Sequence, residues 1–133
     1  MLKIRIGMGF DIHRTEPGVP LILGGYEIAS EFGLVSNTDG DVVLHAIIDA
    51  MLACARLPDI GLLFPPQNAA GLSVRSSELV KETMRLIESA GFRVDQVDVT
   101  ILAESPQLSP HYRGIAESIS SLFPLPVRTG PRL

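Results

Sequence analysis

The sequence predicts a single domain of mixed α and β structure, and three observations support this. The chain has 133 residues, a length typical of one domain. Apolar residues recur at every second position over residues 2–10, the period of a strand, and at helical spacing over residues 39–55. With 46% hydrophobic and 20% charged residues, the chain has enough apolar material for a packed core, which excludes a disordered or fibrous protein.

Two β elements are predicted near the N-terminus. Residues 2–10 alternate apolar and other side chains, which indicates a half-buried strand. Residues 21–28 form a hairpin around Gly24 and Gly25, because glycine readily adopts the positive φ that a two-residue turn requires.

Helices dominate the middle of the chain. A largely buried helix is predicted over residues 39–55, with Thr38 or Asp39 as its N-cap. A long loop over residues 57–72 follows, and loops of that length are often functional. An amphipathic helix is predicted over residues 74–90.

The last predicted elements are a strand over residues 97–101 and a helix over residues 110–123. The resulting order is strand, hairpin, helix, helix, strand, helix. Residues 124–133 contain three prolines and a glycine, which predicts an extended tail after a domain spanning residues 1–123.

Charge and composition exclude several functions. Fifteen acidic and eleven basic residues give a net charge of −4, and no basic run or aromatic platform is present, so we expect no nucleic-acid partner. No segment reaches the length of a membrane-spanning helix, so we expect no membrane association. The single cysteine, Cys54, fits a reducing compartment, and we expect a cytoplasmic protein.

Asp11, His13 and His45 are candidate metal ligands. Asp11 and His13 are two residues apart at a strand end, so both side chains leave the same face, and His45 near the start of the first helix can converge on them. Three protein ligands leave one position of a zinc ion open for water or substrate. In the alternative interpretation, His13 only caps a strand end and His45 is an ordinary polar residue of a helix face.

Two carboxylates flank His45 on the same helix. Asp41 lies four residues before it and Asp49 four residues after it, and a carboxylate one turn away can fix the tautomer of a ligating imidazole. Asp41 can equally complement the helix dipole.

Two further segments suit a phosphorylated ligand. Polar side chains and free N–H groups over residues 37–41 gather at a helix N-terminus, which favours phosphate but is explained nearly as well by a cap. The loop over residues 59–66 combines an acid, a glycine and an apolar anchor, and either wraps a ligand or merely turns the chain.

Several of these segments, taken together, resemble the 2-C-methyl-D-erythritol 2,4-cyclodiphosphate synthase family. The matching motifs are GFDIH at 9–13, TDGDVVLHA at 38–46, DIG at 59–61 followed by Phe64-Pro65, DVT at 98–100, and the turn at 106–111. They occur in the family's order, and the resemblance extends to about Phe123.

The resemblance implies a fold, an assembly and a reaction. The fold is a small mixed β-sheet with helices packed on one face, in a homotrimer whose active sites lie between neighbours. The reaction is that of a phosphorus–oxygen lyase in the non-mevalonate route to isoprenoids. The 2-phosphate of a cytidine-diphosphate-linked methylerythritol attacks the diphosphate, forms a cyclic diphosphate and expels CMP, so positioning and charge neutralisation carry the catalysis.

The resemblance also implies residue roles. It places zinc on Asp11, His13 and His45, and it places Asn37 and Thr38 at catalytic positions where both can donate a hydrogen bond to phosphate. The implied substrate contacts are Asp11, Ile12, His13, Asp59, Ile60, Gly61 and Phe64, together with a cytidine-binding segment, contributed to a neighbour's site, that includes Ala103, Pro106, Gln107 and Leu108.

The chain departs from the family pattern at several positions. Asn37 replaces a histidine, Pro66 an acid, and Gln107 a lysine, and Met8 stands at another histidine position. No acid follows Glu117, so the usual magnesium-binding carboxylate and a last strand are expected to be missing. A second hypothesis is therefore a catalytically impaired relative that binds zinc and a nucleotide or phosphate; a third is a shortened product that folds poorly.

Overall fold

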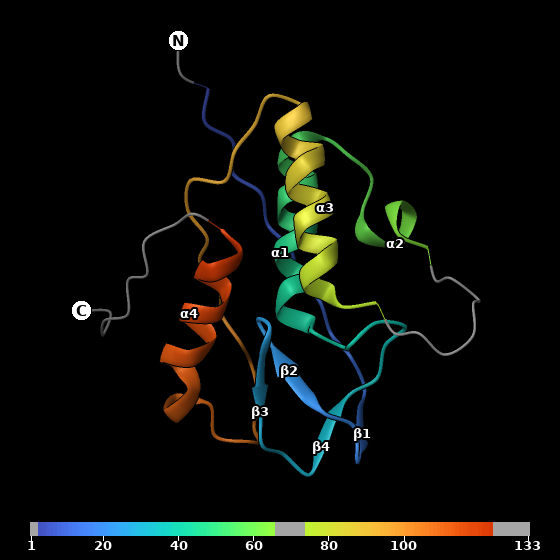
Figure 1. The fold of residues 1–133 in the computed structure, drawn as a ribbon, viewed down its shortest axis with the longest axis vertical. Coiled ribbons are helices and arrows are strands. Elements are labelled where there is room, and N and C mark those ends of the chain that lie inside the picture. The colour runs from blue at the N-terminus through green and yellow to red at the C-terminus, as the bar shows by residue number, and fades with distance from the viewer. Residues whose placement is uncertain (1–2, 66–73, 124–133) are drawn as a thin grey trace.

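The computed structural model of the chain describes residues 3–65 and 74–123 (Figure 1). The predicted tail, 124–133, and part of the predicted loop lie outside the described residues. The elements in chain order are β1 (Thr15–Pro17), β2 (Leu21–Leu23), β3 (Tyr26–Ile28), β4 (Phe32–Leu34), α1 (Val42–Ala55), α2 (Ile60–Leu63), α3 (Ser76–Ser89), the 3-10 helix η1 (Ser109–His111) and α4 (Tyr112–Leu122). The predicted combination of helices and strands is confirmed.

The predicted hairpin is present as the antiparallel pair β2–β3. Leu21 lies opposite Ile28 and Leu23 opposite Tyr26. Gly24 and Gly25 form the turn with φ of +66° and +78°, backbone angles that residues with a Cβ rarely adopt. Leu21, Leu23 and Ile28 of this pair are buried in the core.

A second antiparallel pair, β1–β4, is not predicted by the sequence. Thr15 lies opposite Leu34 and Pro17 opposite Phe32. Each strand is only three residues long and β1 is fully exposed, so neither offers an apolar alternation long enough to predict a strand. Within the described residues the strands therefore form two antiparallel pairs, β1–β4 and β2–β3.

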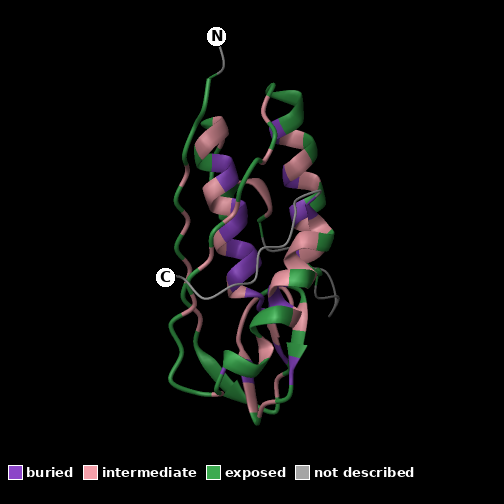
Figure 2. Ribbon diagram, turned by 90° about the vertical axis from the view of Figure 1, so that its left-hand side faces the viewer, coloured by how far each residue is buried: buried purple, intermediate pink, exposed green. Residues whose placement is uncertain are grey.

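The predicted strand over residues 2–10 is extended chain, and its described residues pair with no other strand. The prediction that its apolar side chains are buried is wrong. Figure 2 shows this segment as an exposed trace beside the helices, and the exposed apolar side chains include Ile6 at 94% and Met8 at 88%. The glycines face inward instead: a Cβ on Gly9 would lie 1.8 Å from the Ala46 carbonyl oxygen, and a Cβ on Gly7 would lie 2.1 Å from that of Ala50. Because glycine has no side chain, this backbone can lie directly against α1.

The predicted strand over residues 97–101 is likewise not a strand in the described structure. Its apolar residues Val97, Val99 and Ile101 pack partly buried against the core, as the alternation predicts. What is missing in the described structure is pairing with a neighbouring strand, because an alternating pattern carries no information on which backbone lies alongside.

The three long helices lie close to their predicted positions. Asp41, rather than Thr38 or Asp39, is the N-cap of α1, and its side chain accepts a hydrogen bond from the Leu44 N–H. The C-cap of the helix is Arg56, whose φ of 58° lies in the left-handed region. The loop after α1 contains the short helix α2, which the sequence does not predict.

The core is centred on α1. This helix and α3 pack side by side and run in the same direction (Figure 1), and Figure 2 shows α1 as the most continuously buried helix. Leu44, Ile48 and Leu52 have no exposed surface. In the described part of the chain no helix is long and apolar enough to cross a bilayer.

Candidate metal centre

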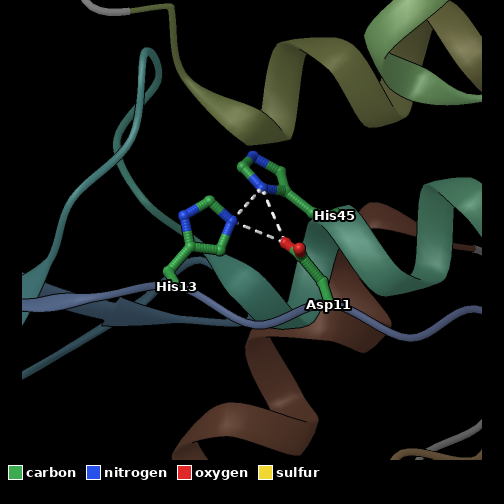
Figure 3. Close-up of side chains that lie close together, drawn as sticks. All are labelled: Asp11, His13 and His45. Atoms are coloured by element: carbon green, nitrogen blue, oxygen red, sulfur yellow. Dashed lines mark hydrogen bonds and ion pairs between the residues drawn. The ribbon is translucent and has the colours of Figure 1, made fainter.

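Asp11, His13 and His45 meet at the N-terminal end of α1 (Figure 3). The His13 Nε2 atom lies 2.7 Å from Asp11 Oδ2, and His45 Nδ1 lies 3.1 Å from the same oxygen. The two ring nitrogens are 3.3 Å apart. The structure therefore brings together, within 4.8 Å of one another, three ligand atoms from parts of the chain separated by up to 34 residues.

Local backbone structure positions each of these side chains. Asp11 and His13 alternate with Ile12, which is 79% exposed, so both leave the extended segment on the inward side. The His13 Nδ1–H donates to the carbonyl oxygen of Val35 at 2.8 Å. A carbonyl can only accept, so His13 keeps its Nε2 lone pair for the cluster.

His45 is held from outside the cluster by two hydroxyl groups. Its Nε2 lies 3.0 Å from Thr38 Oγ1 and 2.9 Å from Ser76 Oγ. The predicted partners of His45 were Asp41 and Asp49, and that prediction is wrong. The Asp41 carboxylate instead accepts a hydrogen bond from the Gly24 N–H, and the Asp49 carboxylate accepts one from the Ile60 N–H.

Asp41 ties the hairpin turn to α1. It is fully buried, and its carboxylate accepts hydrogen bonds from the N–H groups of Gly24 at 2.8 Å, Gly25 at 2.6 Å and Leu44 at 3.0 Å. Burial raises the pKa of the Asp41 carboxyl above its ordinary value, and the three N–H donors offset part of that effect. This is a structural role, since Asp41 connects the turn and the helix.

The donor set of the cluster fits zinc. Two imidazole nitrogens and one carboxylate oxygen are a common catalytic zinc ligand set, and three protein ligands leave a coordination position open. The side chains of Asp11 and His13 are 24% and 16% exposed, whereas that of His45 is 7% exposed. The open side of the cluster therefore faces solvent through Asp11 and His13.

The predicted phosphate-contacting pair is divided between two environments. Asn37 is exposed, so its amide can reach a ligand. The Thr38 hydroxyl lies against His45 Nε2 and accepts a hydrogen bond from the Gly40 N–H at 3.2 Å. Thr38 is therefore part of the scaffold around the cluster.

The predicted sugar-contacting loop is the N-terminus of α2. The Asp59 carboxylate is exposed and accepts from the Leu62 N–H at 3.0 Å. The Ile60 N–H donates to Asp49 at 2.9 Å, which anchors the loop to α1. Gly61 is exposed and Phe64 is half-buried.

The predicted cytidine-binding segment lines a separate pocket. Ala103, Pro106, Gln107 and Leu108 contribute to its wall, and the pocket has a volume of about 460 Å³. Figure 1 shows the segment leading into α4 and the helix α2 on opposite sides of the α1–α3 pair. One chain therefore does not bring this pocket together with residues 59–61.

Ser76 is a site residue that the sequence analysis missed. It is fully buried and lies at the first position of α3, 31 residues from His45. A serine at the start of a predicted helix is ordinarily read as a cap. The available signal is that Ser76 lies at the start of a helix. When two helices pack side by side in the same direction, the start of one lies near the start of the other, and His45 lies near the start of α1.

Comparisons with known proteins show which family the chain belongs to. The profile of the YgbB family matches residues 4–129. The 2-C-methyl-D-erythritol 2,4-cyclodiphosphate synthase of Nitrosomonas europaea is 45% identical over 126 residues, which cover 95% of this chain and 77% of the relative. The chloroplastic enzyme of Arabidopsis thaliana is 43% identical over 122 residues, which cover 92% of this chain. The chain spans 53% of the length of that plant relative.

Solved structures give the same result. A CDP-bound structure of 2C-methyl-D-erythritol-2,4-cyclodiphosphate synthase matches with a TM-score of 0.83 and 39% sequence identity, covering 92% of this chain and 81% of that one. The CDP complex of IspF from Plasmodium falciparum matches with a TM-score of 0.76 and 30% identity, covering 92% of this chain and 74% of that one.

Proposed function

Since the chain belongs to the YgbB family, we propose that it converts 4-diphosphocytidyl-2-C-methyl-D-erythritol 2-phosphate into 2-C-methyl-D-erythritol 2,4-cyclodiphosphate and CMP. The observation that carries this proposal is the convergence of Asp11, His13 and His45 on one point. A reaction in which a phosphate of the substrate attacks another needs no protein nucleophile. It needs groups that hold two anions together.

These three side chains would hold a divalent ion, and zinc matches their chemistry. When bound, zinc supplies Lewis-acid polarisation of phosphate oxygens and neutralises charge that develops between them. His13 and His45 would bind it as neutral imidazoles, and Asp11 would contribute a carboxylate oxygen. We also propose that magnesium, as a second ion, would bind the diphosphate of the substrate. No carboxylate of the chain is assigned to it.

The chain's own residues would position the substrate. Asn37 donates to a phosphate from its exposed position, and Asp59 accepts from hydroxyl groups of the methylerythritol chain. Asp59 suits this role because only part of its carboxylate is used by the Leu62 N–H. Phe64 and the exposed Ile12 offer apolar contact for the carbon skeleton.

The cytidine would bind in the pocket near Gln107 of a second copy of the chain. Support comes from the segment leading into α4, whose residues line this pocket. Figure 1 shows that segment and α2 on opposite sides of the α1–α3 pair. The exposed apolar side chains Ile4, Ile6, Met8 and Phe10 favour self-association, because a row of large apolar groups in water is typical of an interface. A homotrimer with shared active sites fits both observations, and the lone Cys54 fits the reducing cytoplasm.

A second candidate function is binding without turnover. It is favoured by Asn37, which cannot carry the positive charge of an imidazolium, and by the Thr38 hydroxyl, which is occupied by His45 and Gly40. In this alternative the chain is a relative that holds zinc and a cytidine nucleotide or phosphate.

Incubation of the full chain with the cytidine-diphosphate substrate, zinc and magnesium tests the proposal. We expect release of CMP and a cyclic diphosphate, both followed by ³¹P NMR, and we expect His45→Ala to abolish both. The control is Lys81→Ala, an exposed residue of α3 outside the cluster, which should keep activity. Zinc and CMP binding without product would favour the second candidate, and absence of zinc binding would exclude both.

A further inference from the structure

The Nε2 atom of His45, which faces away from the three-residue cluster, contacts a buried serine of α3. The Ser76 hydroxyl lies 2.9 Å from His45 Nε2, on the side of the ring opposite Asp11 and His13. Ser76 has no exposed surface, so this contact is shielded from bulk solvent. One of the three candidate ligands therefore has a buried polar partner on the side away from the cluster.

Asp39 determines the orientation of the Ser76 hydroxyl. The two carboxylate oxygens of Asp39 accept from Ser76 twice, from its N–H at 3.0 Å and from its O–H. Since the hydroxyl hydrogen is used by Asp39, the Ser76 oxygen presents a lone pair to His45. His45 must then donate through Nε2–H, and its Nδ1 lone pair points to the cluster.

We propose that Ser76 and Asp39 are positioning residues that hold His45 in the Nε2–H tautomer, with Nδ1 as the metal-binding atom. This inference rests on the proposed function only in taking the cluster to hold a divalent metal. A ligating histidine that donates its other ring N–H to an acceptor is fixed in tautomer and orientation and becomes more basic. Here that acceptor is the Ser76 oxygen, and Asp39 in turn orients Ser76. The Thr38 hydroxyl, 3.0 Å from the same nitrogen, is a second acceptor.

The same contacts link the centre to the fold. Arg75, the N-cap residue of α3, makes no side-chain capping bond, and the Asp39 carboxylate instead accepts the first N–H of that helix. The neighbouring residues Thr38 and Val74 form an isolated bridge. A test must therefore separate positioning of His45 from simple support of α3.

Zinc affinity of the full chain, measured by competition with a chromogenic chelator, provides this separation. We expect Ser76→Ala to weaken zinc binding by about 10–100-fold, the usual loss for an outer partner of a ligating histidine. Asp39→Asn is the second variant, and it should weaken binding in the same direction while retaining an amide oxygen for the helix. The matched control is Ser77→Ala, the adjacent half-buried serine of α3, which should bind zinc like the unmodified chain.

Side-chain ¹H–¹⁵N NMR of the zinc-loaded protein supplies a readout that helix support would not change. We expect His45 to bind zinc through Nδ1 and to show a hydrogen-bonded Nε2–H signal that shifts in Ser76→Ala but not in Ser77→Ala. Coordination through Nε2, or a folded Ser76→Ala with unchanged zinc affinity, would overturn the inference. If zinc binds as expected but no CMP is released, the proposed function fails and the positioning role stands.

Discussion

Replacement of Asp41 by alanine should reveal how strongly one buried carboxylate joins the hairpin to α1. The substitution removes the acceptor of three N–H groups. The bond to Leu44 is a helix N-cap, whose loss costs about 1 kcal/mol. The N–H of Gly24 is buried and would be left unpaired, at about 1–3 kcal/mol, whereas Gly25 is exposed and can turn to water.

The expected loss in the free energy of unfolding is therefore about 2–4 kcal/mol, a large share of the ~5–15 kcal/mol typical of a domain. Urea unfolding followed by circular dichroism at neutral pH, with a chelator present to remove metal effects, measures it. Glu27→Ala, on the exposed side of β3, is the control and should change stability by less than about 0.5 kcal/mol. An equally small change for Asp41→Ala would refute the argument that these bonds hold the turn and helix together.

Three further outcomes are expected. Because burial raises the pKa of Asp41, its contribution to stability is fully present below the unfolded value of about 3.8 and declines as pH rises through the raised folded value; Asp41→Asn should remove this decline in urea titrations across that range, and an unchanged pH profile would contradict it. Gly9→Ala places a Cβ 1.8 Å from the Ala46 carbonyl, so it should destabilise the chain by about 3 kcal/mol or more, and an unchanged urea midpoint would argue against the close approach to α1. Cys54→Ala should retain CMP release, since the proposed reaction uses no thiol; inactivity in a folded variant would count against the mechanism.

The self-association proposed here connects the fold to the site. Residues 4–10 present apolar side chains to water on one side and glycines to α1 on the other. The same segment continues directly into Asp11 and His13. An interface formed by this face would therefore stabilise the extended chain that carries two of the three candidate ligands.

Much of this structure is predictable from local patterns. The hairpin follows from two adjacent glycines between apolar runs, and the long helices follow from apolar spacing, because both patterns act within a few residues. Asp11 and His13 could be paired from the sequence since their two-residue spacing leaves both on one face of extended chain. The implied roles of Asp59 and of residues 103–108 depended on family resemblance, because nothing in their composition distinguishes a ligand contact from a turn.

Only the tertiary structure decided which face of residues 3–10 is inside and what lies behind His45. Alternation identifies two faces, but the glycine face is the inner one here because α1 comes too close for any side chain. Asp41 and Asp49 lie one turn from His45 along α1 and its N-cap, yet the His45 Nε2 atom contacts Thr38 and Ser76, and Ser76 belongs to a helix that begins 31 positions later. Sequence periodicity indicates on which face of its own helix or strand a residue lies. Contacts between elements depend on how closely the backbones pack, and that distance is set by the whole core.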